Sequence, residues 1–504
     1  MAREEQAGLG AVTVDDIGAI DSSFRTALRR LDTAGRLVKV TQPLALQDEV
    51  AGVMKALDGG PALLFENAGG HEMTVLGNFL SGDENCRTAL GLDRDGMRSV
   101  MQRALDEPIE PVHTSGGPAQ EIVLDAADID LGRQLPVLRH TPDDSGRFIT
   151  AGVILVRDPA TGVHNASFHR LQLLGERHTG LKLDYGRHLR FACERAAERG
   201  ESLPIAVCLG TDVALTYAGA YMGSQMPPDA DERAAAGGLR GAPLELIDCV
   251  SVPLAVPAET EIVLEGVIHP DRMVHEGPFA EFVGYLSDSG PSPVFEVTAM
   301  TMRRDPVYHA ISGAGRETII LRKHVLEAGA LRAVRRAVPI VTDVELTAGG
   351  LYRFHLVVQV AKRSSRDEGF QRNAMLAAFA ALKDLDQVIV VDDDIDITDP
   401  HDVEYAVATR VEASRDITLL PGMRGHEYVR VSDGGVRTKV CIDATVPLAE
   451  RERFTRASFS RVDLDPAEAD TTPGTSRVPW LAAGAPDAAG NGAPAVERSG
   501  TLAT

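Results

Sequence analysis

A long run of strand-like segments between Ile149 and Tyr308 limits the folds open to this chain. Its residues are β-branched or alternate between apolar and polar, and turn residues separate the segments. The segments read ITAGVILVRD, VHNASFHRLQLL, PIAVCLG, EIVLEGVIH and PVFEVTAMTMRR. This pattern predicts one long mixed or antiparallel sheet in the middle of the chain. Two helices are expected between these strands, over about 186–199 and 231–239.

The flanking regions predict α+β structure on either side of that sheet. On the N-terminal side we expect a helix capped by Asp21 and ended by Gly35, two strands separated by a Gly-Gly turn at 69–70, and a helix over 87–105. On the C-terminal side a helix over 322–337 precedes a strand, strand, helix, strand pattern, which indicates a compact α/β domain. Residues 481–504 are rich in Ala and Gly and are expected to be disordered.

Composition narrows the class of protein. Hydrophobic content is 44% and charged content 25%, as in globular proteins with two or three cores. The net charge of -22 argues against nucleic acid as a partner. Five scattered cysteines predict buried free thiols rather than disulfides or zinc knuckles. No run of roughly 18 apolar residues and no signal-peptide profile is found, so we expect a cytoplasmic protein without a membrane span.

Two short motifs could carry chemistry. In HEGPFAEFVGY, a Gly-Pro pair between Glu276 and Glu281 prevents regular helix, so a turn can aim both carboxylates at one spot and separate their pKa values. In HNASFHRLQ, alternation places Asn165, Ser167 and His169 on one side of a strand, and Arg170 could pair with a glutamate or hold a substrate carboxylate. Taken alone, the glutamate pair fits a solvated loop better than a catalytic site, and HNASFHRLQ fits an ordinary surface strand equally well.

Common nucleotide-binding and hydrolase motifs are absent from the sequence. It contains no G-x-G-x-x-G after a strand, no G-x-x-x-x-G-K-[ST], no G-x-S-x-G and no H-E-x-x-H. The acidic run VVDDDIDITDPHD lacks the glycine and the terminal glutamate of an EF-hand loop. These observations give no support to Rossmann, P-loop, α/β-hydrolase or zincin chemistry.

Taken together, the segments resemble the UbiD family of prenylated-FMN-dependent decarboxylases, with ferulic acid decarboxylase and 3-octaprenyl-4-hydroxybenzoate carboxy-lyase as relatives. The resemblance runs from the first helix to about Pro447 and depends on unusual strings that occur in the family's order. The strings are GGPALLFEN, ITAGVILVRDP, HNASFHRLQ, CLGTD, VPAETEIVLEG, HEGPFAEFVGY, VVDDDIDITDPHDVEYAVATR and TKVCIDAT.

The resemblance implies a cofactor site and a set of catalytic residues. By motif position, Glu281, Arg170 and Glu276 correspond to the family's catalytic set, with Glu281 as the proton donor. Asn165, His188 and Glu232 correspond to the ligands of Mn²⁺ (or Mg²⁺), which anchors the phosphate of prenylated FMN, often together with K⁺. The cofactor cradle is implied to comprise Asn165, Ala166, Ser167, Phe168, His169, Arg170, Arg187, His188 and Lys439.

The same resemblance implies an architecture. The fold expected is α+β, with a central split β-barrel-like flavin-binding domain and an α/β C-terminal oligomerisation domain. The expected division is an N-terminal α+β region (1–115), the prenylated-FMN domain (116–310), a linker helix (311–337), the oligomerisation domain (338–447) and an extension (448–504). We expect a homodimer or higher homo-oligomer that receives its cofactor from a flavin prenyltransferase.

The predicted function is a non-oxidative decarboxylation, open to reversal, of an α,β-unsaturated, aromatic or heteroaromatic carboxylic acid in a specialised biosynthetic or catabolic pathway. Two alternatives stay open. A flavin-binding carrier without turnover would not need both glutamates and the arginine. A metal-dependent hydrolase with an activated water at Asn165, His188 and Glu232 would act without flavin.

Overall fold

The computed structural model describes residues 17–184, 187–221, 226–227, 229–426, 428–431 and 434–458. Two compact units are distinguished, residues 1–449 and 450–504, and the first contains all four sheets of the described chain. The tail expected to be disordered (481–504) lies outside the described residues. No helix in the described ranges is long and apolar enough to cross a membrane.

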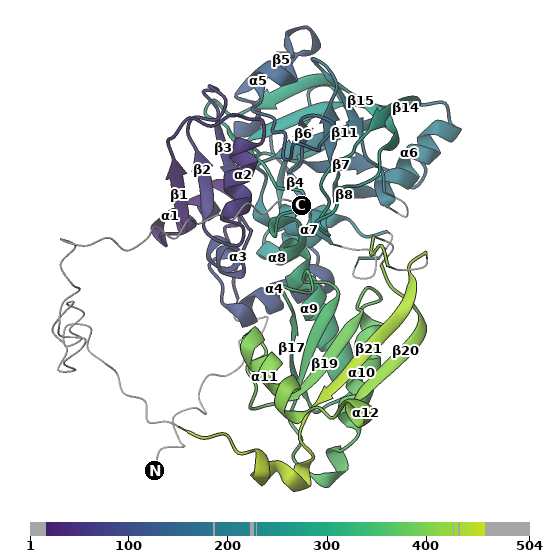
Figure 1. Ribbon diagram of the computed structural model, residues 1–504. Helices are drawn as coiled ribbons and strands as arrows, with labels where there is room; N and C mark the ends of the chain where they lie inside the picture. The colour runs from purple at the N-terminus through teal and green to yellow at the C-terminus, as the bar shows by residue number, and fades with distance from the viewer. Residues whose placement is uncertain are drawn as a thin grey trace, which may run out of the picture. The chain divides into compact units, whose positions relative to one another are not determined.

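The N-terminal region is a four-stranded sheet with four helices (Figure 1). Its sheet has the order β1-β2-β3-β16, so a strand from the end of the central region completes it. The elements are α1 (Phe24–Thr33), β1 (Leu37–Val40), α2 (Glu49–Ala56), β2 (Ala62–Phe65), β3 (Thr74–Gly77), α3 (Asp83–Leu90), α4 (Arg94–Asp106) and β16 (Val307–His309). The predicted strands and the Gly69–Gly70 turn, where φ is +61° and +73°, are confirmed.

Two sequence-based expectations in this region are wrong. The helix predicted over 87–105 is two helices, because Gly91 adopts φ +69° after α3 and Asp93 begins a new helix by accepting a bond from the amide of Gly96 (2.7 Å). Asp21 does not occupy the cap position of α1, which belongs to Ser23; it accepts instead from the amide of Ser23 (3.1 Å) and from Thr26 (2.7 Å).

The central region is a curled antiparallel half-barrel of nine strands. The strand order is β6-β9-β10-β15-β14-β11-β7-β8, with β5 paired to β15. The strands are β5 (Ile122–Asp125), β6 (Phe148–Ile149), β7 (Val153–Arg157), β8 (His164–Phe168), β9 (Leu171–Leu173), β10 (His178–Leu181), β11 (Leu203–Leu209), β14 (Ile262–Glu276) and β15 (Gly290–Met302). This confirms the long antiparallel sheet expected between Ile149 and Tyr308.

Helices and a small sheet surround the half-barrel. The helices are α5 (Leu131–Gln134), α6 (His188–Glu198), α7 (Val213–Ala220) and α8 (Glu232–Arg240). Of these, α6 and α8 confirm the two helices expected between the strands. A three-stranded sheet has the order β13-β12-β4, from Ala255–Pro257, Glu245–Asp248 and Val112–His113. Of the five free cysteines, four are buried as expected and Cys249 is half-buried.

The C-terminal region is a five-stranded mixed sheet with the order β17-β18-β19-β21-β20. It comprises β17 (Val341–Leu346), β18 (His355–Val360), α10 (Phe370–Ala381), β19 (Gln387–Asp392), α11 (Pro400–Arg410), α12 (Ala413–Asp416), β20 (Ile417–Arg424) and β21 (Val436–Ala444). The strand, strand, helix, strand pattern is confirmed. In Figure 1 the helix α9 (Glu317–Ala337) lies between this sheet and the half-barrel.

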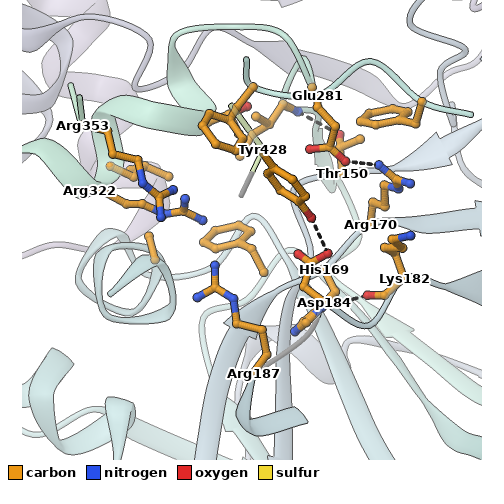
Figure 2. Close-up of a pocket in the computed structure, with 18 of the residues that line it drawn as sticks. Thr150, His169, Arg170, Lys182, Asp184, Arg187, Glu281, Arg322, Arg353 and Tyr428 are labelled. Atoms are coloured by element: carbon orange, nitrogen blue, oxygen red, sulfur yellow. Dashed lines mark hydrogen bonds and ion pairs between the residues drawn. The ribbon is translucent and has the colours of Figure 1, made fainter. Parts of the chain in front are cut away.

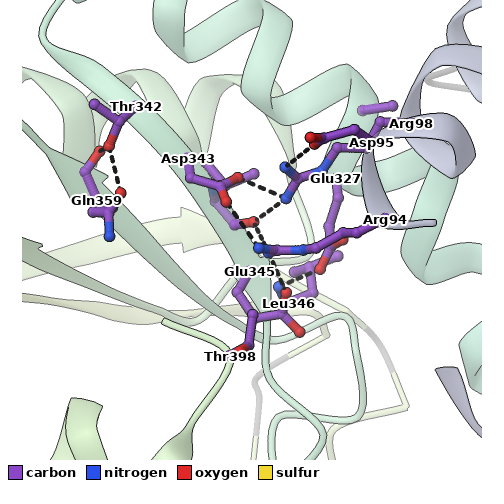
Figure 3. A network of polar contacts seen from close by, with 12 residues as sticks. Arg94, Asp95, Arg98, Glu327, Thr342, Asp343, Glu345, Leu346, Gln359 and Thr398 are labelled. Atoms are coloured by element: carbon purple, nitrogen blue, oxygen red, sulfur yellow. Dashed lines mark hydrogen bonds and ion pairs between the residues drawn. The ribbon is translucent and has the colours of Figure 1, made fainter. Parts of the chain in front are cut away.

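A network of charged side chains joins α4, α9 and β17 (Figure 3). Arg94 contacts Asp343 (2.8 Å) and Glu345 (2.6 Å), and Lys323 on α9 contacts Glu345 (2.8 Å). Glu327 accepts from the backbone amide of Leu346 (2.7 Å). Because these groups are partly or fully buried and share partners, they hold α9 at a defined position against the C-terminal sheet.

Candidate active site

Two adjoining cavities lie beside the half-barrel, with volumes of about 150 Å³ and 90 Å³. We refer to them as the large and the small cavity. Side chains of α9 and of the C-terminal region also line the large cavity, which Figure 2 shows. The two cavities adjoin, since they share six lining residues, Phe168, His169, Asp184, Arg187, Ala220 and Arg322.

Strand β8 and the residues after it supply most of the predicted cradle. Residues 165–169 all line the small cavity, and Arg170 lines the large one. β8 is the terminal strand of the half-barrel and pairs only with β7 among the described strands, so its free edge leaves room for a ligand. Arg187 lines both cavities, immediately before α6.

The three predicted metal ligands come together in the small cavity from separate elements. Asn165 lies on β8, His188 begins α6 and Glu232 begins α8. The Asn165 amide nitrogen lies 2.8 Å from a Glu232 oxygen and 3.4 Å from Nδ1 of His188. The other Glu232 oxygen accepts from the amide of Ala166 (3.0 Å). Sequence spacing gave no indication of this contact, whereas the family resemblance did.

The electrostatics of this trio suit a cation. Glu232 is 5% exposed, and burial raises the pKa of its carboxyl to about 8, while hydrogen bonds from Ala166 and Asn165 act in the opposite direction. Within the described residues no group of three or more His, Cys, Asp or Glu side chains is placed to hold a metal ion, so a ligand set here includes the asparagine. Carboxylate oxygen, imidazole nitrogen and amide oxygen are ligands that suit Mn²⁺ or Mg²⁺.

Arg170 lies between the two predicted glutamates. Its Nε and Nη2 donate to the two oxygens of Glu276 at 2.7 Å and 3.0 Å, and its Nη1 donates to Glu281. Nη2 also donates to Ser287 (3.0 Å), and the guanidinium lies 5.0 Å from the centre of the Phe279 ring. The side chains of Arg170 and Glu276 are 7% and 0% exposed, so this is a buried, bidentate ion pair.

A turn brings the two glutamates to the same arginine. Glu276 ends β14, and the next peptide, Gly277–Pro278, is cis. Gly277 has φ +85°, which favours glycine, and its amide donates to the side chain of Gln172 (3.1 Å). The chain then returns so that the amide of Ser287 bonds to the carbonyl of Phe279 (2.8 Å). The expectation that this turn aims both carboxylates at one spot is confirmed.

Glu281 is the more exposed of the two glutamates, and its pKa is raised. Its side chain is 22% exposed and lines the large cavity. Burial raises the pKa of Glu281, and the neighbouring carboxylates Asp184 and Glu276 add to that shift, while Arg170 acts against it. A carboxyl group of this kind can hold a proton and deliver it to a ligand in the cavity.

His169 presents an unpaired acceptor. Its Nδ1 lies 2.9 Å from the carbonyl oxygen of Lys182, so Nδ1 carries the hydrogen. Burial lowers the pKa of His169, which favours the neutral ring. Nε2 is buried without a hydrogen-bond partner in the described chain. Since His169 lines both cavities, a bound group with an N–H or O–H could pair with it there.

Several lining residues were not identified from the sequence. Asp184 accepts from the hydroxyl of Tyr428 (2.8 Å), and this bond lowers the pKa of Asp184 against the effect of its burial. Arg322 comes from α9 and Arg353 from the segment between β17 and β18. They lie far from the sequence motifs, and only tertiary packing brings them to the cavity.

Lys439 does not reach either cavity. It lies on β21 in the C-terminal sheet, where its Nζ donates to the carbonyl of Lys383 (2.6 Å) and lies 5.0 Å from the Phe379 ring. The side chain is turned toward α10 because β21 is a central strand of that sheet. The geometry therefore separates Lys439 from the other predicted cradle residues.

Comparison with known proteins gives consistent matches along the chain. Models of the N-terminal, Rift-related and C-terminal domains of 3-octaprenyl-4-hydroxybenzoate carboxy-lyase match residues 28–104, 110–316 and 320–444. Anhydromevalonate phosphate decarboxylase of Methanosarcina mazei is 37% identical over 436 residues, covering 86% of this chain and 99% of the relative.

Solved structures agree with these matches. The UbiD-class enzyme HmfF from Pelotomaculum thermopropionicum, in complex with FMN, has a TM-score of 0.82 and 38% identity over 86% of this chain and 97% of its own. An evolved dimeric form of HmfF in complex with prFMN has a TM-score of 0.78 and 36% identity over 88% and 97%. The apo 3,4-dihydroxybenzoic acid decarboxylase from Enterobacter cloacae has a TM-score of 0.82 and 31% identity over 88% and 98%. The chain therefore belongs to the UbiD family and is a UbiD-like carboxy-lyase.

Proposed function

We propose that this chain is a prenylated-FMN-dependent, non-oxidative decarboxylase, able to run in either direction, of an α,β-unsaturated, aromatic or heteroaromatic carboxylic acid. The observation that carries the proposal is the position of Arg170, which is paired with Glu276 and Glu281 on the wall of one cavity, while the adjoining cavity is lined by the Asn165, His188 and Glu232 trio. This arrangement places a carboxylate-binding group and a proton donor beside a site suited to a phosphate-bearing cofactor.

The residues present fit such a cofactor. The trio could hold a Mn²⁺ or Mg²⁺ ion against the flavin phosphate, in family members often together with K⁺, and Arg187 beside it could contact the same phosphate. The orphaned Nε2 of His169 could accept from the ring system. When bound, prenylated FMN supplies the electron sink that decarboxylation requires. The FMN and prFMN complexes of HmfF support this assignment.

The chain's own groups would orient the substrate and move the proton. Arg170 is held in place by two bonds to Glu276, so its third nitrogen is directed toward the cavity side occupied by Glu281. A protonated Glu281 would free that nitrogen for the substrate carboxylate. Glu281 Oε would then give its proton to the carbon that loses carbon dioxide. In the reverse direction the same carboxylate would accept the proton.

The first test is purification after co-expression with a flavin prenyltransferase, followed by visible spectrum, cofactor mass and metal content of one preparation. We expect prenylated FMN with about one divalent ion per chain, the number that fits one trio. Release of carbon dioxide is then screened with anhydromevalonate phosphate, 3,4-dihydroxybenzoate and heteroaromatic acids. Folded protein that binds neither cofactor nor metal would refute the proposal, and activity in colourless protein would instead favour a metal hydrolase.

Assembly is proposed on the same basis. Because HmfF has been obtained in an evolved dimeric form, we expect this chain to form a homodimer or a larger homo-oligomer through its C-terminal domain. Light scattering of the purified protein should give a mass at least twice the 53.8 kDa of the chain. A monomer at micromolar concentration would contradict this expectation.

A further inference from the structure

The large cavity carries more positive charge than the proposed chemistry uses. In a protein with a net charge of -22, its lining holds two anionic side chains and five cationic ones. The anionic residues are Asp184 and Glu281, and the cationic residues are Arg170, Lys182, Arg187, Arg322 and Arg353. Arg170 is paired with glutamates, and Arg187 adjoins the trio. Lys182 lies on the side of Arg170, and Arg322 and Arg353 on the other side have no role in the proposed chemistry.

Arg322 has no anionic partner. Within the described ranges no hydrogen bond or ion pair involves its guanidinium, and its Nε is buried without an acceptor. Burial, together with the nearby charges of Arg353 and Arg187, lowers the pKa of Arg322 to about 9, so the group stays charged at neutral pH. Arg322 is half-buried and faces the cavity, so its guanidinium, which has no ion-pair partner among the described residues, is available to an anion that fills the cavity.

Arg353 is held in a fixed orientation beside it. Its Nε and Nη2 both donate to one oxygen of Asp384, at 2.9 Å and 2.7 Å, and its guanidinium lies 5.4 Å from the centre of the Phe282 ring. Nη1 has no acceptor among the described residues. Asp384 does not line the cavity, so it binds Arg353 on the side away from the cavity. The side of the guanidinium that faces the cavity stays available to a ligand.

Both arginines lie apart from Arg170 in the large cavity, and Arg322 also lines the small cavity. Figure 2 shows Arg322 and Arg353 together on one side of the large cavity and Arg170 with Lys182 on the other. The residue after Arg322 is Lys323, which contacts Glu345 (2.8 Å) and Asp83 (3.0 Å). These contacts fix the helix at this point, so Arg322 is presented by a rigid element rather than a loop.

We propose that Arg322 and Arg353 bind a second anionic group of the substrate, a carboxylate or a phosphate monoester, at the end remote from the carboxylate that leaves. This inference rests on the proposed function, because Arg170 is taken to bind the leaving carboxylate. Guanidinium groups pair well with either anion. The natural substrate would then be an acid with two anionic groups, and acids whose remote end is neutral would be poor substrates.

Two substrate pairs and one matched variant test this. The pairs are an α,β-unsaturated acid with and without a terminal phosphate, and an aromatic dicarboxylate with its monocarboxylate. Arg322→Gln is compared with Arg336→Gln, which changes an exposed arginine of the same helix. Binding to FMN-loaded protein by titration calorimetry and kcat/KM with the prenylated cofactor are measured, with flavin and metal content determined for each preparation.

In one of the two pairs, the wild-type protein should prefer the acid that carries the second anionic group. The pair that shows this preference identifies the second group of the substrate as a phosphate or a carboxylate. Arg322→Gln should lower kcat/KM for the preferred acid about 10- to 100-fold, mainly through a higher KM, and leave kcat/KM for the other acid and the flavin content unchanged. Arg336→Gln should behave like wild type. The inference would be overturned if Arg322→Gln lowered kcat/KM equally for both acids of the pair or lost its flavin, or if wild type preferred neither acid in either pair. Calorimetric preference without turnover would support the anion site while the proposed reaction failed.

Discussion

Replacing Glu276 by glutamine should destabilise the protein measurably, although the two side chains have nearly the same shape. Glu276 is completely buried and accepts two hydrogen bonds from Arg170, which is itself 7% exposed. The variant removes one charge of a buried pair and leaves Arg170 with Glu281 as its remaining carboxylate partner. A buried cation that loses its main partner is the cause of the instability.

The magnitude follows from the burial of the pair. Breaking a buried ion pair costs about 3–5 kcal/mol, and the lower end applies here because glutamine keeps one acceptor and Glu281 stays in place. If residues 1–449 unfold together, an unfolding entropy of about 2.1 cal/mol/K per residue gives about 0.9 kcal/mol/K in total. A loss of roughly 3 kcal/mol then lowers Tm by about 3 °C.

Differential scanning calorimetry of flavin-free protein measures this shift without interference from ligand binding. Glu194→Gln is the control, since Glu194 forms an exposed pair with Arg190 on α6 and should change the stability by less than about 1 kcal/mol. Arg170→Met combined with Glu276→Gln should recover part of the loss, because the buried cation is removed and the remaining Glu281 is 22% exposed and has a raised pKa, so it can take up a proton. A shift for Glu276→Gln no larger than that of the control would refute the argument.

Three further outcomes are expected. Glu281→Gln should bind flavin and metal normally but form no product, and normal turnover would rule out Glu281 as the acid. Glu232→Gln should reduce metal content and flavin retention together, whereas loss of neither would exclude it as a ligand. Lys439→Met should leave the flavin content unchanged, because the Lys439 side chain bonds to the carbonyl of Lys383 and lines neither cavity. A variant that lost its flavin would show that Lys439 does contribute to cofactor binding.

Much of the fold could be predicted because strands and helices leave local patterns. Alternation between Ile149 and Tyr308 predicted the half-barrel strands, and the C-terminal pattern predicted the mixed sheet. The break between α3 and α4 was missed, since it depends on Gly91 and on a cap by Asp93 that the surrounding helical composition conceals. The pairing of β16 with β3 joins residues more than 200 apart, and no local pattern reports such a contact.

The site was predictable only in part. The turn between Glu276 and Glu281 indicated two converging carboxylates, but their arginine lies 106 and 111 residues away. Family resemblance, rather than spacing, selected Arg170 and the trio. Neither pattern nor resemblance indicated Arg322 and Arg353. Arg322 has no ion-pair partner among the described residues and Arg353 is oriented by Asp384, and both facts depend on tertiary packing rather than on local sequence.

The unequal environments of the two glutamates link substrate binding to pH. Glu276 makes two bonds to Arg170 and is fully buried, while Glu281 makes one and is 22% exposed. Ionised Glu281 competes with a substrate carboxylate for Arg170, and Lys182 and Asp184 are the other charged groups near it. Because the pKa of Glu281 is raised, its protonated form persists to higher pH than for an ordinary glutamate. Affinity for the acid, measured by titration of FMN-loaded protein, should therefore fall as pH rises through that pKa. Glu281→Gln should remove this dependence, and an unchanged profile in that variant would assign the titration to another group.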